Sequence, residues 1–356
     1  MLQCNLTVPH GTALASSDTL SRFVPVTIWM GDDTSVFENH AVTITPITVA
    51  TPGEDKDIGT LSHPYGTIAY ALTMAEAGDT VLVQEGIYSS KETFPLFIRQ
   101  GVTIQGQGEV EVVSVSSEDD IIRRSWGSED EYHPTRLENL TLRTGSNGWE
   151  IDGGYVTMRN VSLVGTGLVG IGAHSDTHLT LEHVTVDGFY VESKSCAVCA
   201  WEHSVVDARE LTVKNAYYGV VSVEASFVSM AFAALSYNYY GVAAWGSAES
   251  CVSNSEIFHN NRGVVVLEQA KFSATDTTIG ENLQTGITAL NQADAHGEIY
   301  LDNVENVTAE TAIFEIDGKQ FHPPSGTVEG VGGYPEDEAR PFYLIQNPDA
   351  SITFSD

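Results

Sequence analysis

Two neighbouring stretches decide the fold: residues 230–246 read MAFAALSYNYYGVAAWG, and residues 252–268 read VSNSEIFHNNRGVVVLE. Aligned on each other, they match in their apolar positions, in an asparagine and in a glycine, at an interval of 22 residues. A unit this short cannot bury its own apolar face, so it must stack on its neighbours. The same glycine interval, 22 or 23 residues, recurs in two sets along the chain: Gly148 and Gly170, then Gly219, Gly241, Gly263 and Gly286.

Each repeat carries apolar residues at i, i+3 and i+5, followed by a second apolar run after the glycine, as in Gly263-Val264-Val265-Val266-Leu267. The runs are rich in β-branched residues and too short for helices, so they indicate short strands with a bend between them. A β-propeller would need about 40 residues per blade. The pattern therefore predicts an all-β fold, a single-stranded parallel β-helix. Its turns would stack an asparagine ladder: Asn215, Asn238, Asn260 and Asn282.

The period holds only in the middle of the chain, which predicts three parts. Residues 1–50 form an N-terminal β segment, residues 51–318 the parallel β-helix, and residues 319–356 a cap or attachment tail. Residues 67–77 have helical spacing and precede Gly78, which predicts a short helix covering the N-terminal end of the solenoid. A longer interval before Gly219 predicts an insertion near residues 194–201.

The chain is strongly acidic, with 48 acidic and 16 basic residues among 356 and a net charge of −32. Such a chain repels itself, and concentrated salt screens the repulsion. The composition resembles that of proteins from halophiles and their viruses. It argues against nucleic acid as a partner, because phosphate binding needs a basic stripe. No stretch has the length and hydropathy of a membrane span, and Met1–Leu6 does not resemble a secretory signal. We therefore expect the chain to stay inside a cell or to leave it as part of a particle.

A segment of the chain resembles a known family in its order of short motifs. These are Pro52-Gly53, His63-Pro64-Tyr65-Gly66-Thr67-Ile68, Ala77-Gly78-Asp79-Thr80-Val81, Glu85-Gly86-Ile87-Tyr88 and Gly101-Val102-Thr103-Ile104-Gln105-Gly106. Residues 52–106 are similar to the N-terminal segment of pectate-lyase-like right-handed parallel β-helix proteins. The resemblance implies the fold and its handedness. It does not imply an activity, because the family includes lyases, hydrolases, adhesins and viral spikes. The viral spikes imply a homo-oligomer, most simply a trimer.

Placing the coils in register puts charged residues of alternating sign in one outward column. The favoured interpretation is a salt-bridge ladder on a solvated face. The alternative is a polysaccharide lyase with Arg209 or Lys214 as base and calcium held by carboxylates, although no family catalytic motif matches. The column holds Glu138, Arg159, Glu182 and Arg209; the lyase set is Arg209, Lys214, Glu182, Asp187, Asp207 and Glu210.

Tyrosines fall in register beside the repeating glycine. Such a row either packs on itself, which is the favoured interpretation, or offers ring faces for sugars to stack on. The candidate carbohydrate-binding residues are Tyr190, Tyr217, Tyr218, Tyr239, Tyr240 and Trp201.

Cys196 and Cys199 have the spacing of metal ligands, with His203 nearby and His174 expected in register with Cys196 one coil earlier. A lone C-x-x-C pair is weak evidence for zinc, so we favour inert thiols over a disulfide or a zinc site. No cofactor is expected, apart from the calcium that a lyase would use.

Three classes of function remain open. The favoured class is a non-catalytic extracellular or virion structural protein of a halophile or its virus, such as a spike or fibre, that contacts host surface glycans and other virion proteins in high salt. The alternatives are a lyase or glycoside hydrolase acting on acidic polysaccharide, and a purely structural building block.

Overall fold

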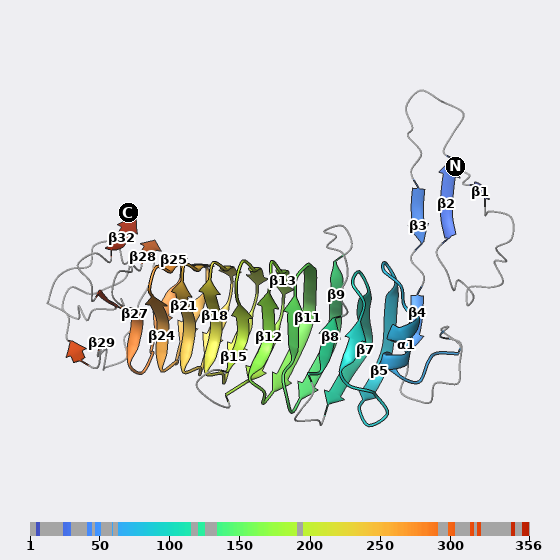
Figure 1. Cartoon of the computed structure of the whole chain (residues 1–356), viewed down its shortest axis with the longest axis horizontal. Helices are drawn as coiled ribbons and strands as arrows, with labels where there is room; N and C mark the ends of the chain where they lie inside the picture. The colour runs from blue at the N-terminus through green and yellow to red at the C-terminus, as the bar shows by residue number, and fades with distance from the viewer. Residues whose placement is uncertain are drawn as a thin grey trace.

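The chain coils into an elongated rod, with β5 near one end and β27 near the other (Figure 1). The computed structural model describes residues 59, 63–114, 120–124, 134–190 and 195–290, together with the backbone of short strands outside these ranges. All strand pairings along the rod are parallel and join residues one coil apart, such as Val242 with Val264. This confirms the predicted parallel β-helix.

One side of the rod is a ten-stranded parallel sheet to which successive coils contribute one strand each. Its strands are β6 (Leu96–Ile98), β8 (Ile122–Arg124), β10 (Trp149–Asp152), β12 (Val169–His174), β15 (Cys196–Ala200), β18 (Tyr218–Glu224), β21 (Tyr240–Gly246), β24 (Arg262–Leu267), β27 (Thr285–Leu290) and β31 (Tyr343–Ile345).

A second set of strands wraps the rest of the rod, and in most coils one residue with positive φ splits it into two. His183, with φ of 53°, separates β13 from β14 in this way. This is the bend predicted by the i, i+3, i+5 spacing. The set comprises β4 (Ile47–Ala50), β5 (Thr80–Tyr88), β7 (Thr103–Ser114), β9 (Thr135–Thr144), β11 (Tyr155–Gly165), β13 (His178–Glu182), β14 (Thr185–Gly188), β16 (Val205–Arg209), β17 (Thr212–Lys214), β19 (Phe227–Ala231), β20 (Ala234–Ser236), β22 (Glu249–Ser253), β23 (Glu256–Phe258), β25 (Lys271–Thr275), β26 (Thr278–Gly280), β28 (Glu298–Asp302) and β32 (Ser351–Ser355).

Antiparallel strands pair outside this framework: β1 (Asn5–Thr7), β2 (Val24–Trp29) and β3 (Ala41–Ile44), and separately β29 (Phe314–Ile316) and β30 (Lys319–Phe321). Most of residues 1–58 and 291–356 lie outside the described residues. The division at residues 50 and 318 therefore stays a prediction.

The interior of the rod holds the apolar side chains and a ladder of buried asparagines. Asn238 Nδ2 donates to Asn260 Oδ1 at 3.0 Å, and Asn260 Nδ2 donates to Asn282 Oδ1 at 3.2 Å. Each Oδ1 also accepts a backbone N–H of the preceding coil, as from Asn238 N to Asn260 at 3.0 Å. The ladder therefore satisfies polar groups that have no access to water, and it confirms the predicted contact between coils.

Asn215 is not part of this ladder, contrary to the prediction. Ala216 takes the equivalent position and donates its N–H to Asn238 Oδ1 at 3.0 Å. Asn215 is exposed at a bend with φ of 59°, and its amide donates to Asp187 at 2.7 Å. Asparagine tolerates the left-handed backbone of this bend. Its presence there explains why the sequence pattern placed Asn215, rather than Ala216, in the ladder.

Helix α1 (Ile68–Met74) lies at the N-terminal end of the rod and packs against β4, β5 and β6 (Figure 1). Thr67 caps it by accepting from Tyr70 N at 3.1 Å, and Glu92 accepts from Ile68 N and Ala69 N. The predicted helix is confirmed, although it ends at Met74 because Ala75 is already extended.

Candidate functional site

The outer face of the ten-stranded sheet carries both ionisable and aromatic side chains. Alternate residues of its strands point into the core, such as Ile171, Val198 and Val220, so their neighbours point outward. The pairing register places the outward residues in three columns. They are Val169, Cys196, Tyr218, Tyr240 and Arg262; Arg123, Glu150, Gly172, Cys199, Val221, Ala243 and Val265; and Asp152, His174, Trp201, Val223 and Trp245. We call this surface the outer face.

The half of the outer face on β15, β18 and β21 is a small hydrophobic cluster separate from the core. Val221 and Ala243 are only 2% and 1% exposed although they point away from the interior. Larger side chains cover them: the rings of Tyr218 and Trp245 approach across the middle column, with centroids 5.6 Å apart. This part of the surface is therefore apolar and firmly packed.

The predicted tyrosine row is present and stacks on itself. Tyr217 and Tyr239 are 4.7 Å apart and nearly parallel at 5°, and Tyr218 and Tyr240 are 5.0 Å apart at 12°. Their inner faces are therefore covered by each other, so mainly ring edges and hydroxyl groups face solvent. Tyr190, 55% exposed, lies at one end of the row, tilted 55° from Tyr217.

Three hydroxyl groups of the row, those of Tyr217, Tyr218 and Tyr240, are held in the protonated form. Burial raises the pKa of Tyr240 to about 12, despite the opposing charge of Arg262, and burial also raises the pKa of Tyr217 and Tyr218. A row of neutral hydroxyl groups can both donate and accept hydrogen bonds.

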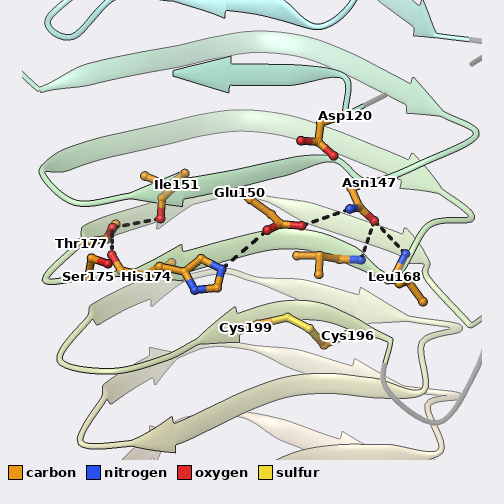
Figure 2. A network of polar contacts seen from close by, with 12 residues as sticks. Asp120, Asn147, Glu150, Ile151, Leu168, His174, Ser175, Thr177, Cys196 and Cys199 are labelled. Atoms are coloured by element: carbon orange, nitrogen blue, oxygen red, sulfur yellow. Dashed lines mark hydrogen bonds and ion pairs between the residues drawn. A yellow bond between two sulfur atoms is a disulfide. The ribbon is translucent and has the colours of Figure 1, made fainter. Parts of the chain in front are cut away.

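The half of the outer face on β8, β10 and β12 is polar and is centred on Glu150 (Figure 2). Asn147 Oδ1 accepts the backbone N–H groups of Leu168 and Val169 in the next coil, at 2.9 and 3.1 Å. Those bonds fix the amide so that its Nδ2 donates to Glu150 Oε1 at 3.0 Å. The other carboxyl oxygen, Oε2, lies 3.8 Å from His174 Nε2. The side chain of Glu150 is thus held from one side and faces an imidazole on the other.

Asp120 lies in the preceding coil and is only 13% exposed, with Arg123 Nε donating to its Oδ2 at 3.0 Å (Figure 2). Partial burial raises the pKa of Glu150, and the negative charge of Asp120 raises it further, while His174 and Arg123 oppose the shift. The carboxylate of Asp120 therefore favours the neutral form of Glu150 at this end of the face.

His174 joins the two halves of the outer face. Its ring stacks on Trp201 at 4.2 Å and 7°, and its Nε2 is buried without a hydrogen bond. Gly172 lies beneath: a Cβ there would be 2.9 Å from the Trp201 ring and 3.5 Å from His174 Nε2. The glycine therefore lets both rings lie against the sheet.

The cysteine predictions need two corrections. Cys196 and Cys199 form a disulfide, so they are not the inert thiols that we favoured. Cys196 pairs in register with Val169, and His174 lies beside Trp201 instead. Residues 196–200 form strand β15, so the extra residues of this coil precede the strand and do not include it.

Zinc finds no support in this arrangement. The disulfide leaves neither Cys196 nor Cys199 a free thiolate, and His203 Nδ1 lies 4.0 Å from Asp176 Oδ1. Within residues 63–114, 120–124, 134–190 and 195–290, no group of three or more histidine, cysteine or acidic side chains is placed to hold a metal ion.

The charged column is present in the predicted register. Arg159 Nε lies 2.6 Å from Glu182 Oε2, and its Nη1 lies 4.0 Å from Glu138 Oε1. Arg209 leaves the ladder: its guanidinium lies 4.7 Å above the Phe232 ring and 3.8 Å from Glu210.

The residues of the predicted lyase set do not converge on one site but lie in three separate parts of the surface. Arg209 and Glu210 line a hollow of about 550 Å³ at the bend, with His183 and Phe232. Lys214 pairs with Asp187 at 3.2 Å farther along the coil. Asp207 lines a different hollow of about 280 Å³ beside Tyr155 and His178.

Sequence reasoning missed Glu150, Asp120 and Asn147. A signal for Glu150 existed, because the same column position holds Gly172, Cys199, Val221, Ala243 and Val265 in the following coils. A carboxyl group that occurs once in an otherwise apolar column is an exception to the repeat.

Comparisons with solved structures show the fold. XylC in complex with xylose matches with a TM-score of 0.54 and 11% identity, covering 79% of this chain and 72% of that one. The mannuronan C-5 epimerase AlgE4 A-module of Azotobacter vinelandii gives 0.44 and 16%, covering 80% and 92%. The tailspike protein 4 domain of bacteriophage CBA120 gives 0.48 and 13%, covering 68% and 38%.

No curated protein matches the chain at a significant level. None of the described helices is long and apolar enough to cross a membrane. The family described as "Protein of unknown function (DUF1565)" matches residues 51–304, which is most of the solenoid. The chain therefore belongs to the DUF1565 family, with the pectate-lyase-like β-helix fold that its sequence resembles.

Proposed function

We propose that the chain is a surface protein that recognises glycans on the outer face. The observation that carries this proposal is the apolar cluster around Val221 and Ala243, which is bordered by tyrosine hydroxyl groups on one side and by Glu150 and His174 at one end. Sugars combine apolar C–H faces with many hydroxyl groups, so their sites combine aromatic side chains with a few polar groups. The fold is compatible with such a ligand, since XylC was solved with xylose.

Sugar contact would involve only part of the predicted residue set. Tyr217 and Tyr239 cover each other's inner faces, so they offer hydroxyl groups rather than stacking surfaces. Tyr190 and Trp245 are more open candidates for stacking, Tyr190 at the end of the row and Trp245 at the edge of the cluster. Tyr218, Tyr240 and Trp201 form the cluster on which the sugar would rest.

Binding is tested by calorimetric titration of the intact chain with xylan, β-1,3-glucan and polymannuronate. We expect at least one polymer to bind, and Trp245→Ala and Tyr190→Ala each to weaken it about tenfold. Tyr237→Ala is the matched control, since Tyr237 is 60% exposed outside the outer face. The proposal fails if none of the three polymers binds, or if Tyr237→Ala weakens binding as much as the two test variants do.

The acidic composition supports the proposal that the protein acts in concentrated salt, either on a virion or on a cell surface. Screening of a net charge of −32 should stabilise the folded chain. We expect the melting temperature to rise steadily as potassium chloride is raised to multimolar concentration. A melting temperature that is flat or falls over this range would argue against a high-salt setting, without bearing on glycan binding.

A lyase is not part of this proposal. The two candidate bases are already engaged, Arg209 by Glu210 and Phe232, and Lys214 by Asp187. They also lie on β16 and β17, outside the ten-stranded sheet that carries the outer face.

A further inference from the structure

Glu150 differs from every other residue of its column. It is the one carboxyl group among the described outward residues of that column, and it stands where the apolar half of the outer face ends. A glycan lying along the outer face would therefore meet this carboxyl group next to the Trp201 and His174 rings.

The carboxyl group is held in one orientation. Asn147 is bound through its Oδ1 to two backbone N–H groups, so the amide that contacts Glu150 Oε1 cannot turn without breaking them. Glu150 keeps 42% of its side chain exposed, so a ligand has access to it. A fixed and accessible carboxyl group can exchange a proton with a ligand that lies within hydrogen-bond reach of it.

The neighbouring groups divide the two carboxyl groups into different roles. Asp120 is ion-paired with Arg123 and mostly buried. Glu150 faces Asp120 and Arg123 from the preceding coil, His174 from the following coil and Asn147 within its own. Asp152 is exposed two residues farther along β10. Burial and the charge of Asp120 raise the pKa of Glu150 above its ordinary value, against the opposing effect of His174 and Arg123. Glycosidases use two carboxyl groups in different surroundings, one as acid and the other as base.

We propose that Glu150 is the general acid of a glycoside hydrolysis reaction on the glycan bound along the outer face. This inference rests on the proposed function. Glu150 gives its proton to the bridging oxygen, the bond from that oxygen to the anomeric carbon breaks, and the bonding pair stays on the leaving oxygen. Water adds to the anomeric carbon, and its proton passes to the carboxylate of Asp120. Asp120 then releases that proton to solvent, and Glu150 takes up one proton from solvent, which restores both carboxyl groups to their starting states.

His174 is a positioning residue in this scheme. Its stack on Trp201 and its distance of 3.8 Å from Glu150 Oε2 limit where the carboxyl group can move. Thr177, fully buried, fixes the backbone beneath it by donating to Ile151 O at 3.2 Å (Figure 2).

The test measures release of reducing ends from xylan, β-1,3-glucan and polymannuronate between about pH 4 and pH 8, beside the binding titration. We expect release from the polymer that binds best. Glu150→Gln should lower it by at least about 100-fold while binding changes less than about twofold. In the unmodified chain the rate of release should decline at high pH, because Glu150 loses its proton. The small residual rate of Glu150→Gln should not show that decline. Glu256→Gln, an exposed carboxyl group on β23, is the control.

Asp120→Asn is the second variant, and it should also abolish release while leaving binding intact. Binding without release by the unmodified chain overturns the hydrolase and leaves the proposed function standing. Release that Glu150→Gln does not reduce, or products with the ultraviolet absorbance of an unsaturated sugar, also overturn it. Failure to bind any polymer overturns the proposed function itself.

Discussion

The two halves of the outer face are built on the same strands, yet they differ in how far they repeat. Tyr218 lies directly above Tyr240 in the aromatic half, and both stack with a like neighbour. In the polar half, Glu150 lies above Gly172 in the same column. A repeated residue is explained by stacking on its copy. A residue that occurs once, such as Glu150, has no copy to stack on and needs another explanation.

The asparagine ladder inside the rod follows the same rule. Asn238, Asn260 and Asn282 each satisfy the next one, so no single member can be removed without leaving buried partners unpaired. Repetition in a solenoid therefore marks structural columns, whether they face inward or outward.

The largest effect is expected from breaking an inner column. Asn260→Ala removes the acceptor of Asn238 N and leaves Leu235 O without its donor. Buried groups without partners should lower the free energy of unfolding by about 3 kcal/mol. Chemical denaturation measures the change.

Asn215→Gly is the control for the asparagine ladder, since it removes an exposed amide at a bend with positive φ, where glycine is unstrained. It should change stability by less than about 0.5 kcal/mol. Equal losses in both variants would contradict the view that the inner column is structural.

A smaller effect is expected from the aromatic half. Tyr218→Ala uncovers Val221 and removes the stack with Tyr240, which should cost about 1–2 kcal/mol. Tyr237→Ala, outside the cluster, should cost less. If Tyr218→Ala left stability unchanged, the self-packed interpretation of the row would be wrong, and a role of the rings in binding alone would be favoured.

The features that could be predicted from the sequence are those that repeat from coil to coil, and the features that were missed occur only once. The interval of 22 residues yielded the rod, the asparagine contact and the tyrosine stacks, because each depends only on repetition. Glu150 and His174 depend on register across irregular coils. Extra residues before β15 shifted the alignment of Cys196 from Val169 to His174, so the stack of His174 on Trp201 was not foreseen. The coils around Asp120 are also longer than 22 residues, since Ile122 pairs with Leu96 and with Trp149.

Gly172 tests how the two halves are joined. Gly172→Ala would place a Cβ 2.9 Å from the Trp201 ring and 3.0 Å from Val169 Cγ1. Both are side chains that can shift, so we expect a cost of about 1 kcal/mol. Because the rings must move, tryptophan fluorescence should change. An unchanged spectrum together with unchanged stability would show that the rings do not need the glycine.

The smallest effect is also the one that best separates function from structure at Glu150. Its pKa is raised in the folded chain, chiefly by partial burial. Ionisation is therefore disfavoured by folding, so the stability that Glu150 contributes is fully present below its unfolded pKa and is lost as pH rises through the folded pKa. Glu150→Gln escapes that loss. The free energy of unfolding of the variant, relative to that of the unmodified chain, should therefore rise between about pH 4 and pH 7. The rise should be less than about 1 kcal/mol because the group is partly exposed.

A structural carboxyl group would behave in the opposite way. If Glu150 served mainly to pair with His174 and Asn147, its removal would cost more at pH 7, where the carboxylate is charged, than at pH 4. Melting curves of Glu150→Gln and the control Glu256→Gln at both pH values decide between the two. If Glu150→Gln gains stability relative to the unmodified chain as pH rises, the folded state disfavours the charged form of Glu150. Shifted pKa values of this kind are common among proton-transfer groups.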